Sequence, residues 1–109
     1  MKLAVIDGLA EMAGDYDLFI FDLWGVVHNG VSTYPDATDC MTRLRQGGAR
    51  VVLLSNAPRP SASVAAHLEE LGVQSALYDR LLTSGEATAN AIASRDPQPA
   101  YFHLGPERS

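Results

Sequence analysis

The sequence predicts an α/β fold built on an open, doubly wound parallel sheet. Residues 18–21 (LFIF) and 50–54 (RVVLL) are short, unbroken apolar runs, which is the pattern of strands that are buried on both faces. The segment that follows each run carries its apolar residues at helical spacing instead. Strands that alternate with helices in this way favour a parallel sheet with crossover helices.

The first crossover helix is expected to begin at Pro35 and to end before the pair Gly47 and Gly48. Proline is favoured at the first helical position and glycine just past the end of a helix. The residues expected on its buried face stand at positions i, i+3, i+4 and i+7: Ala37, Cys40, Met41 and Leu44. Cys40 is the only cysteine, so no internal disulfide is expected, and we interpret it as part of the core.

A second helix is expected over 61–71, with Val64, Leu68 and Leu71 on one face and Gly72 at its end. The run RLLTS at 80–84 then predicts a third strand.

Thr83 and Glu86 stand three residues apart as in a capping box, which predicts a further helix through about Ser94. The segment DPQP at 96–99 interrupts the chain, and AYFHLG at 100–105 is expected to form a fourth strand.

Composition and charge narrow the class of protein. The 109 residues are 47% hydrophobic and 19% charged, which fits one small globular domain. Only eight Lys and Arg against thirteen Asp and Glu give a net charge of −5, which argues against a nucleic-acid partner. No apolar run approaches the roughly 20 residues of a membrane span, and the first residues lack the features of a signal peptide. We therefore expect no membrane partner and a cytoplasmic location.

Polar residues follow the first two predicted strands directly. Asp22 comes after the first strand, and Ser55 with Asn56 comes after the second. Adjacent parallel strands lie about 4.8 Å apart, and ligands of such sheets bind beyond the carboxyl ends of the strands. The three side chains are therefore expected to face one small volume.

These motifs resemble those of the haloacid dehalogenase-like superfamily. The segment Asp22-Leu23-Trp24-Gly25-Val26 is similar to its first motif, and VVLLSNAPRP at 51–60 is similar to its second. The turn LLTSGEATANAI at 81–92 resembles the class IIA capped subgroup, which includes sugar-phosphate and nitrophenyl-phosphate hydrolases. The implied fold is the Rossmann-like core of that superfamily.

The resemblance implies a phosphatase that acts on a small phosphorylated metabolite with Mg²⁺ as cofactor. It makes Asp22 the nucleophile, which would form an aspartyl-phosphate. Mg²⁺ would bind the Asp22 carboxylate and the backbone carbonyl of Trp24. Ser55 would hold a phosphoryl oxygen, Asn56 would order the same loop, and Gly25 would turn the chain into a flap over the site. His28 lies in this flap, and we interpret it as a solvated loop residue.

The sequence departs from the resemblance at Trp24, where phosphatases of the family carry a second Asp that acts as general acid and base. Indole N–H does not transfer a proton near neutral pH. General acid–base catalysis contributes about 100- to 10,000-fold, so alkyl phosphates should be slow substrates. Dehalogenases of the superfamily have Tyr at this position, which leaves carbon–halogen hydrolysis as a lower-ranked alternative. A third alternative from another class is a non-catalytic module that binds a phosphate ligand or another protein.

A second departure concerns the later motifs, a Lys and an acidic pair. The only lysine is Lys2, and no acidic pair follows a late apolar strand. We therefore expect the amino-terminal half of the core over 1–96, a linker and the first strand of a truncated cap over 97–109, and little activity from this sequence alone. Residues 18–21 would then form an unpaired sheet edge, which favours a homodimer through that edge.

Overall fold

Three parallel strands form the sheet of the computed structural model, which describes residues 3–106. The strands are β1 (Leu18–Phe21), β2 (Arg50–Ser55) and β3 (Arg80–Thr83), and they lie side by side in the order β1-β2-β3. Phe19 of β1 pairs with Val51 of β2 in parallel register. The predicted class, an open parallel α/β sheet, is confirmed.

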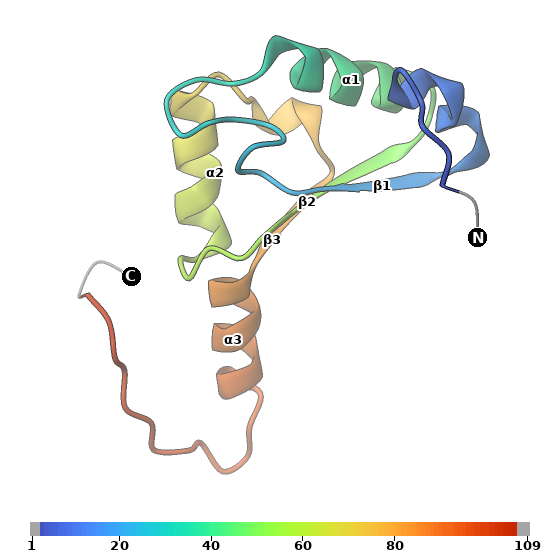
Figure 1. Cartoon of the computed structure of the whole chain (residues 1–109). Coiled ribbons are helices and arrows are strands. Elements are labelled where there is room, and N and C mark those ends of the chain that lie inside the picture. Colours follow the sequence, from blue (N-terminus) through green and yellow to red (C-terminus); the bar gives the residue numbers. More distant parts are fainter. Residues whose placement is uncertain (1–2, 107–109) are drawn as a thin grey trace.

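A helix follows each strand, as the sequence predicts (Figure 1). The helices are α1 (Pro35–Gln46), α2 (Ser61–Glu70) and α3 (Ser84–Ala93), and three short 3-10 turns are η1 (Leu9–Glu11), η2 (Ala13–Asp15) and η3 (Ser75–Leu77). Helices α1 and α2 lie on one side of the sheet, whereas α3 leaves the end of β3 toward the other side (Figure 1).

The hydrophobic core lies between the sheet and the helices α1 and α2. Val51 and Leu53 of β2 are completely buried there, together with Met41 of α1 and Leu68 of α2. The apolar positions at helical spacing thus produce the buried helix faces that the sequence predicts.

The opposite face of the sheet is largely bare. Leu18 and Ile20 of β1 are 49% and 62% exposed, and Leu54 and Leu82 of the neighbouring strands are 46% and 41% exposed. Successive residues of a strand point to opposite faces, so every second apolar residue lies on the side that α1 and α2 do not cover. The prediction that both faces of these strands are buried is therefore wrong for the described residues.

Asp79 lies just before β3 and joins the beginning of that strand to β2 and α1. Its Oδ2 accepts a hydrogen bond of 2.7 Å from the Val51 N–H, and its Oδ1 accepts one of 3.0 Å from Arg45 of α1. The backbone donor and, after it, the Arg45 guanidinium lower the pKa of Asp79 below its usual value.

Residues 100–105 form no strand, so the prediction of a fourth strand there is not met. Tyr101 and Phe102 of this segment are 71% and 85% exposed. After α3 the chain turns back, and the segment runs as exposed chain alongside that helix (Figure 1). A strand needs a neighbouring backbone to pair with, and none of the three strands lies beside this segment. Within residues 3–106, no helix combines the length and the apolar character that crossing a membrane requires.

Candidate active site

A pocket of about 550 Å³ opens at the carboxyl edge of the sheet. All three strands contribute to it, because parallel strands end at the same edge. Its polar lining residues are Asp22, Ser55, Asn56, Thr83 and Ser84, and its apolar ones are Ile20, Leu54, Leu82 and Ala87. The residues predicted at the tips of the first two strands thus line one pocket.

Asp22 directly follows β1 and is exposed at this edge. Its Oδ1 accepts a hydrogen bond of 2.9 Å from the N–H of Leu23, which is buried beneath it. Within residues 3–106, Oδ2 accepts no hydrogen bond, so this oxygen is free to approach a ligand in the pocket.

Ser55 is the last residue of β2 and is only 7% exposed. Its Oγ accepts a hydrogen bond of 3.1 Å from the N–H of Ala57, which leaves its own hydroxyl proton available for donation. Asn56 is exposed and lines the same pocket. The predicted positions of both residues at the strand tip are confirmed, while their contact with substrate stays a prediction.

The chain turns sharply after Asp22, at Gly25. Gly25 has φ +77°, a conformation that side chains disfavour, and its N–H donates to the His28 carbonyl over 2.8 Å. The Trp24 indole does not line the pocket: it packs on Gly30 and against the His28 ring, with ring centroids 5.2 Å apart. Trp24 therefore fastens the flap rather than shaping the pocket wall.

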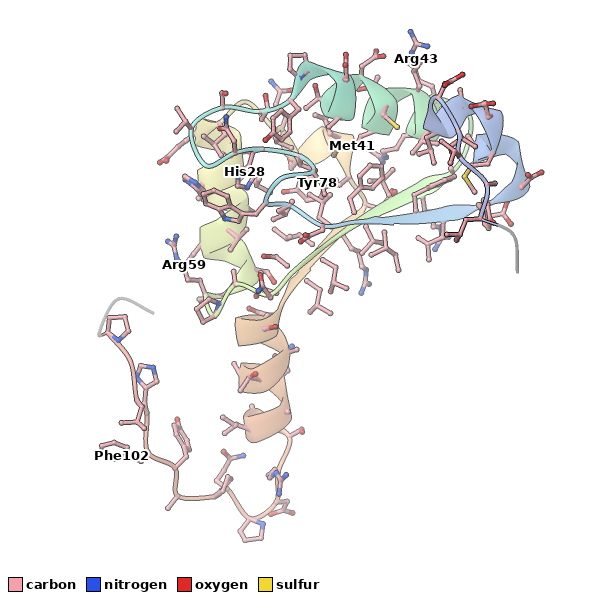
Figure 2. All side chains as sticks on the ribbon, in the orientation of Figure 1. His28, Met41, Arg43, Arg59, Tyr78 and Phe102 are labelled. Carbon is pink, nitrogen blue, oxygen red and sulfur yellow. The ribbon has the colours of Figure 1, made fainter. Side chains whose placement is uncertain are left out.

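His28 is buried, with 2% exposure, so its interpretation as a solvated loop residue is wrong. Its ring lies between the flap and α2, where His67 approaches it at 6.2 Å between centroids (Figure 2). Its Nδ1 accepts a 2.9 Å hydrogen bond from the Gly30 N–H. Burial and, second, the nearby His67 lower the pKa of His28 below 6.5, so the ring is neutral at pH 7.

The third strand also delivers polar groups to the pocket, which the sequence reasoning did not assign. Thr83 ends β3 and Ser84 begins α3, and both line the pocket. The signal was present in the sequence, because the predicted third strand ends at the same edge as the other two. Arg59, in contrast, is an exposed loop residue and points away from the sheet (Figure 2).

The donors around Asp22 suit a hard cation such as Mg²⁺. The Asp22 carboxylate and the Trp24 carbonyl are both oxygen ligands, and the Trp24 carbonyl accepts no backbone hydrogen bond within residues 3–106. No group of three His, Cys, Asp or Glu side chains gathers in that part of the chain. At this edge the described residues thus offer one carboxylate and one carbonyl, a set that Mg²⁺ would accept with water and phosphate oxygens as its further ligands.

Comparisons with known proteins agree with this geometry. Residues 19–109 match the family described as haloacid dehalogenase-like hydrolase. The chain is 30% identical to chronophin of Rattus norvegicus over 105 residues, an alignment that covers 91% of this chain and 34% of chronophin.

A solved structure is similar as well, that of a hydrolase of the haloacid dehalogenase-like family from Brucella suis 1330. It superposes with a TM-score of 0.75 at 39% identity, over 84% of this chain and 35% of that one. The chain thus spans about a third of the length of both relatives, which agrees with the predicted correspondence to the amino-terminal part of a class IIA protein. This chain belongs to the haloacid dehalogenase-like hydrolase family.

Proposed function

We propose that this sequence carries the nucleophile half of a Mg²⁺-dependent phosphatase that acts on a small phosphorylated metabolite. The observation that carries the proposal is the shared pocket at the carboxyl edge, where Asp22 and Ser55 come from neighbouring strands. A carboxylate and a hydroxyl in one pocket can attack and hold the same phosphoryl group.

The reaction follows from these two side chains. An Asp22 carboxylate oxygen attacks phosphorus, the bond between phosphorus and the ester oxygen breaks, and an aspartyl-phosphate forms. The Ser55 hydroxyl donates to a phosphoryl oxygen during this transfer. Water then attacks the aspartyl-phosphate and releases phosphate, which regenerates the Asp22 carboxylate.

Charge supports the requirement for Mg²⁺. None of the pocket-lining residues within 3–106 is Lys or Arg, so a phosphate dianion beside Asp22 would meet no neutralising side chain among them. Mg²⁺ bound by the Asp22 carboxylate and the Trp24 carbonyl would supply that positive charge. The affinity of the pocket for phosphate should therefore depend on Mg²⁺.

The leaving group determines the rate, because the indole of Trp24 cannot give it a proton. An acyl phosphate loses a carboxylate, which departs without protonation, whereas an alkyl phosphate loses a basic alkoxide that must take its proton from water. We therefore expect faster turnover of acyl than of alkyl phosphates.

The test measures phosphate release with and without Mg²⁺ from acetyl phosphate and from an alkyl phosphate. It uses the longest protein that contains this sequence, and inorganic phosphate binding is measured on the 109 residues, whose own turnover we expect to be small. Asp22→Asn should reduce phosphate release to background, and Asp15→Asn, a change at an exposed carboxylate in η2, should leave it unchanged. Equal activity in Asp22→Asn would overturn the proposal.

Assays on the same protein preparation distinguish two alternative functions. Mg²⁺-dependent phosphate binding without release from any ester would favour the non-catalytic phosphate-binding module, which the missing proton donor at Trp24 makes the main competitor. Chloride release from a haloacid would favour the dehalogenase.

We also propose a cytoplasmic location and a homodimer that forms through the free edge of β1. Among the described strands β1 pairs only with β2, so its other edge presents unpaired backbone groups. Sedimentation at rising concentration tests the dimer, and Ile20→Pro, which removes a backbone donor from β1, should weaken it.

A further inference from the structure

The first turn of α3 holds the end of β2 and the segment that follows it, residues 55–60, which we call the 55–60 loop and which carries Ser55 and Asn56. The Gly85 N–H donates to the Ala57 carbonyl over 3.0 Å, and the Thr83 hydroxyl donates to the Arg59 carbonyl over 2.6 Å. Both contacts join residues more than twenty positions apart. The 55–60 loop is therefore fixed by a helix that is distant in sequence.

Gly85 allows this close approach because it has no side chain. A Cβ at this position would overlap the Pro58 carbonyl and lie 2.7 Å from the Arg59 carbonyl oxygen. The obstacle is backbone on both sides, so no side chain can rotate away to make room. A glycine at 85 is what lets the first turn of α3 lie directly against the loop.

Glu86, in the same first turn, completes the attachment at the end of the loop, where α2 begins. Its Oε2 accepts a 3.2 Å hydrogen bond from the N–H of Ser61, which is the first residue of α2. The residue before this helix, Pro60, provides no side-chain cap. Helix first turns carry free N–H groups that need such acceptors. The Glu86 N–H in turn donates to the buried Thr83 Oγ1 over 3.0 Å.

Ala57 connects this attachment to the pocket. Its N–H donates to the Ser55 Oγ, while its carbonyl accepts from the Gly85 N–H. One peptide residue thus lies between the Ser55 hydroxyl and α3. Movement of the α3 first turn would shift Ala57 and release the Ser55 side chain from its orientation.

We propose that Thr83, Gly85 and Glu86 are positioning residues, which hold the 55–60 loop so that Ser55 and Asn56 face the Asp22 pocket. This inference rests on the proposed function, since it assigns these residues to the phosphate site. It gives these three residues a role that acts through the 55–60 loop, in addition to the pocket lining that Thr83 and Ser84 of the same turn provide.

The test compares Glu86→Ala with Glu86→Gln, which keeps an oxygen acceptor, and with Glu69→Ala, a change at an exposed glutamate of α2. Two readouts are measured on the 109-residue chain: amide hydrogen exchange at Ala57 and the Kd for inorganic phosphate with Mg²⁺. Glu86→Ala should accelerate exchange at Ala57 and raise the Kd about tenfold, the loss expected when one hydrogen-bond acceptor is removed. Glu86→Gln and Glu69→Ala should stay within about twofold of the wild type.

A second pair of variants covers the case in which Glu86→Ala fails to fold. Thr83→Val removes the hydroxyl that donates to Arg59, and Thr83→Ser keeps it, so only the valine variant should show the faster Ala57 exchange and the higher Kd.

The outcomes separate this proposal from the proposed function. Unchanged exchange at Ala57, or an unchanged phosphate Kd, in Glu86→Ala and Thr83→Val would overturn the positioning role. A wild-type chain that binds no phosphate with Mg²⁺ would overturn the proposed function, and with it the assignment of these residues to a phosphate site.

Discussion

The two loops that carry the candidate site residues are held in different ways. The loop after β1, residues 22–33, is fastened mostly by its own residues: Gly25 bonds to His28, and Trp24 packs on Gly30. The 55–60 loop is fastened by Thr83, Gly85 and Glu86 of a distant segment. The nucleophile side of the pocket therefore depends on local sequence, while the Ser55 side depends on the docking of α3.

The largest expected effect comes from the first loop. Trp24→Asp places a carboxyl group where the family's phosphatases have their general acid and base, so the rate of alkyl phosphate hydrolysis should rise about 100-fold or more. Acetyl phosphate hydrolysis should change little, because its leaving group needs no proton. Steady-state kinetics on both substrates check this.

The matched control for that change is Trp24→Asn, which removes the same indole from Gly30 but adds no acid. An equal rise in Trp24→Asn would mean that loosening the flap, and not proton transfer, accelerates the reaction. Such a result would mean that the first loop affects the rate only through its packing and not through the missing proton donor at position 24.

The next effect concerns the second loop. Gly85→Ala should lower the free energy of unfolding by about 2 kcal/mol, a typical cost of overpacking, because its Cβ meets backbone of residues 58 and 59. Gly14→Ala, with nothing within 4 Å of the added Cβ, should change it by less than about 0.5 kcal/mol. Urea denaturation of both variants measures the difference, and equal stabilities would show that α3 does not press on the 55–60 loop.

A smaller, pH-dependent effect returns to the first loop. The folded state lowers the pKa of His28, so the unfolded chain binds its proton more readily. Stability should be greatest above pH 6.5 and should decline as the pH falls from 6.5 through the lower folded value, since protonation breaks the bond from Gly30 and opposes His67. In His28→Asn, the stability measured by denaturation between pH 5 and 8 should no longer show this decline. A decline of the same size in that variant would assign it to another group.

The smallest effect lies outside both loops and tests their independence. Asp79→Asn weakens the hydrogen bonds that residue 79 accepts from Val51 and Arg45, at the end of the sheet opposite the pocket. Because the folded state lowers the pKa of Asp79, its contribution is present above about pH 3.8 and disappears as the pH falls through the lower folded value. The variant should be slightly less stable at pH 7 with an unchanged phosphate Kd, and a raised Kd would mean that the pocket senses the whole sheet.

The sequence predicted those parts of the fold that depend on local pattern. Apolar spacing placed α1 and α2, Pro35 and the glycines set their ends, and the polar residues after two strands indicated the pocket. These features depend on residues that are close along the chain, so they can be predicted from the sequence alone.

The rest depends on contacts between distant residues. The capping box was predicted at Thr83 and Glu86, and the Thr83 hydroxyl does accept from the Glu86 N–H, but the Glu86 carboxylate bonds to Ser61 instead of back to Thr83. His28 is buried, and the ring of His67 of α2 lies 6.2 Å from its ring, a contact between distant residues that no spacing in the sequence reveals. The bare face of the sheet likewise follows from where the helices pack.

Gly30 has a consequence for any attempt to redesign this chain. It has φ +88°, and the Trp24 ring fills the space that a Cβ would need, so two independent constraints act on one position. Replacing the indole by a smaller group removes only one of them. Positions 24 and 30 therefore form a coupled pair, and in a double-mutant cycle the cost of a side chain at 30 should fall, but not vanish, once Trp24 is gone.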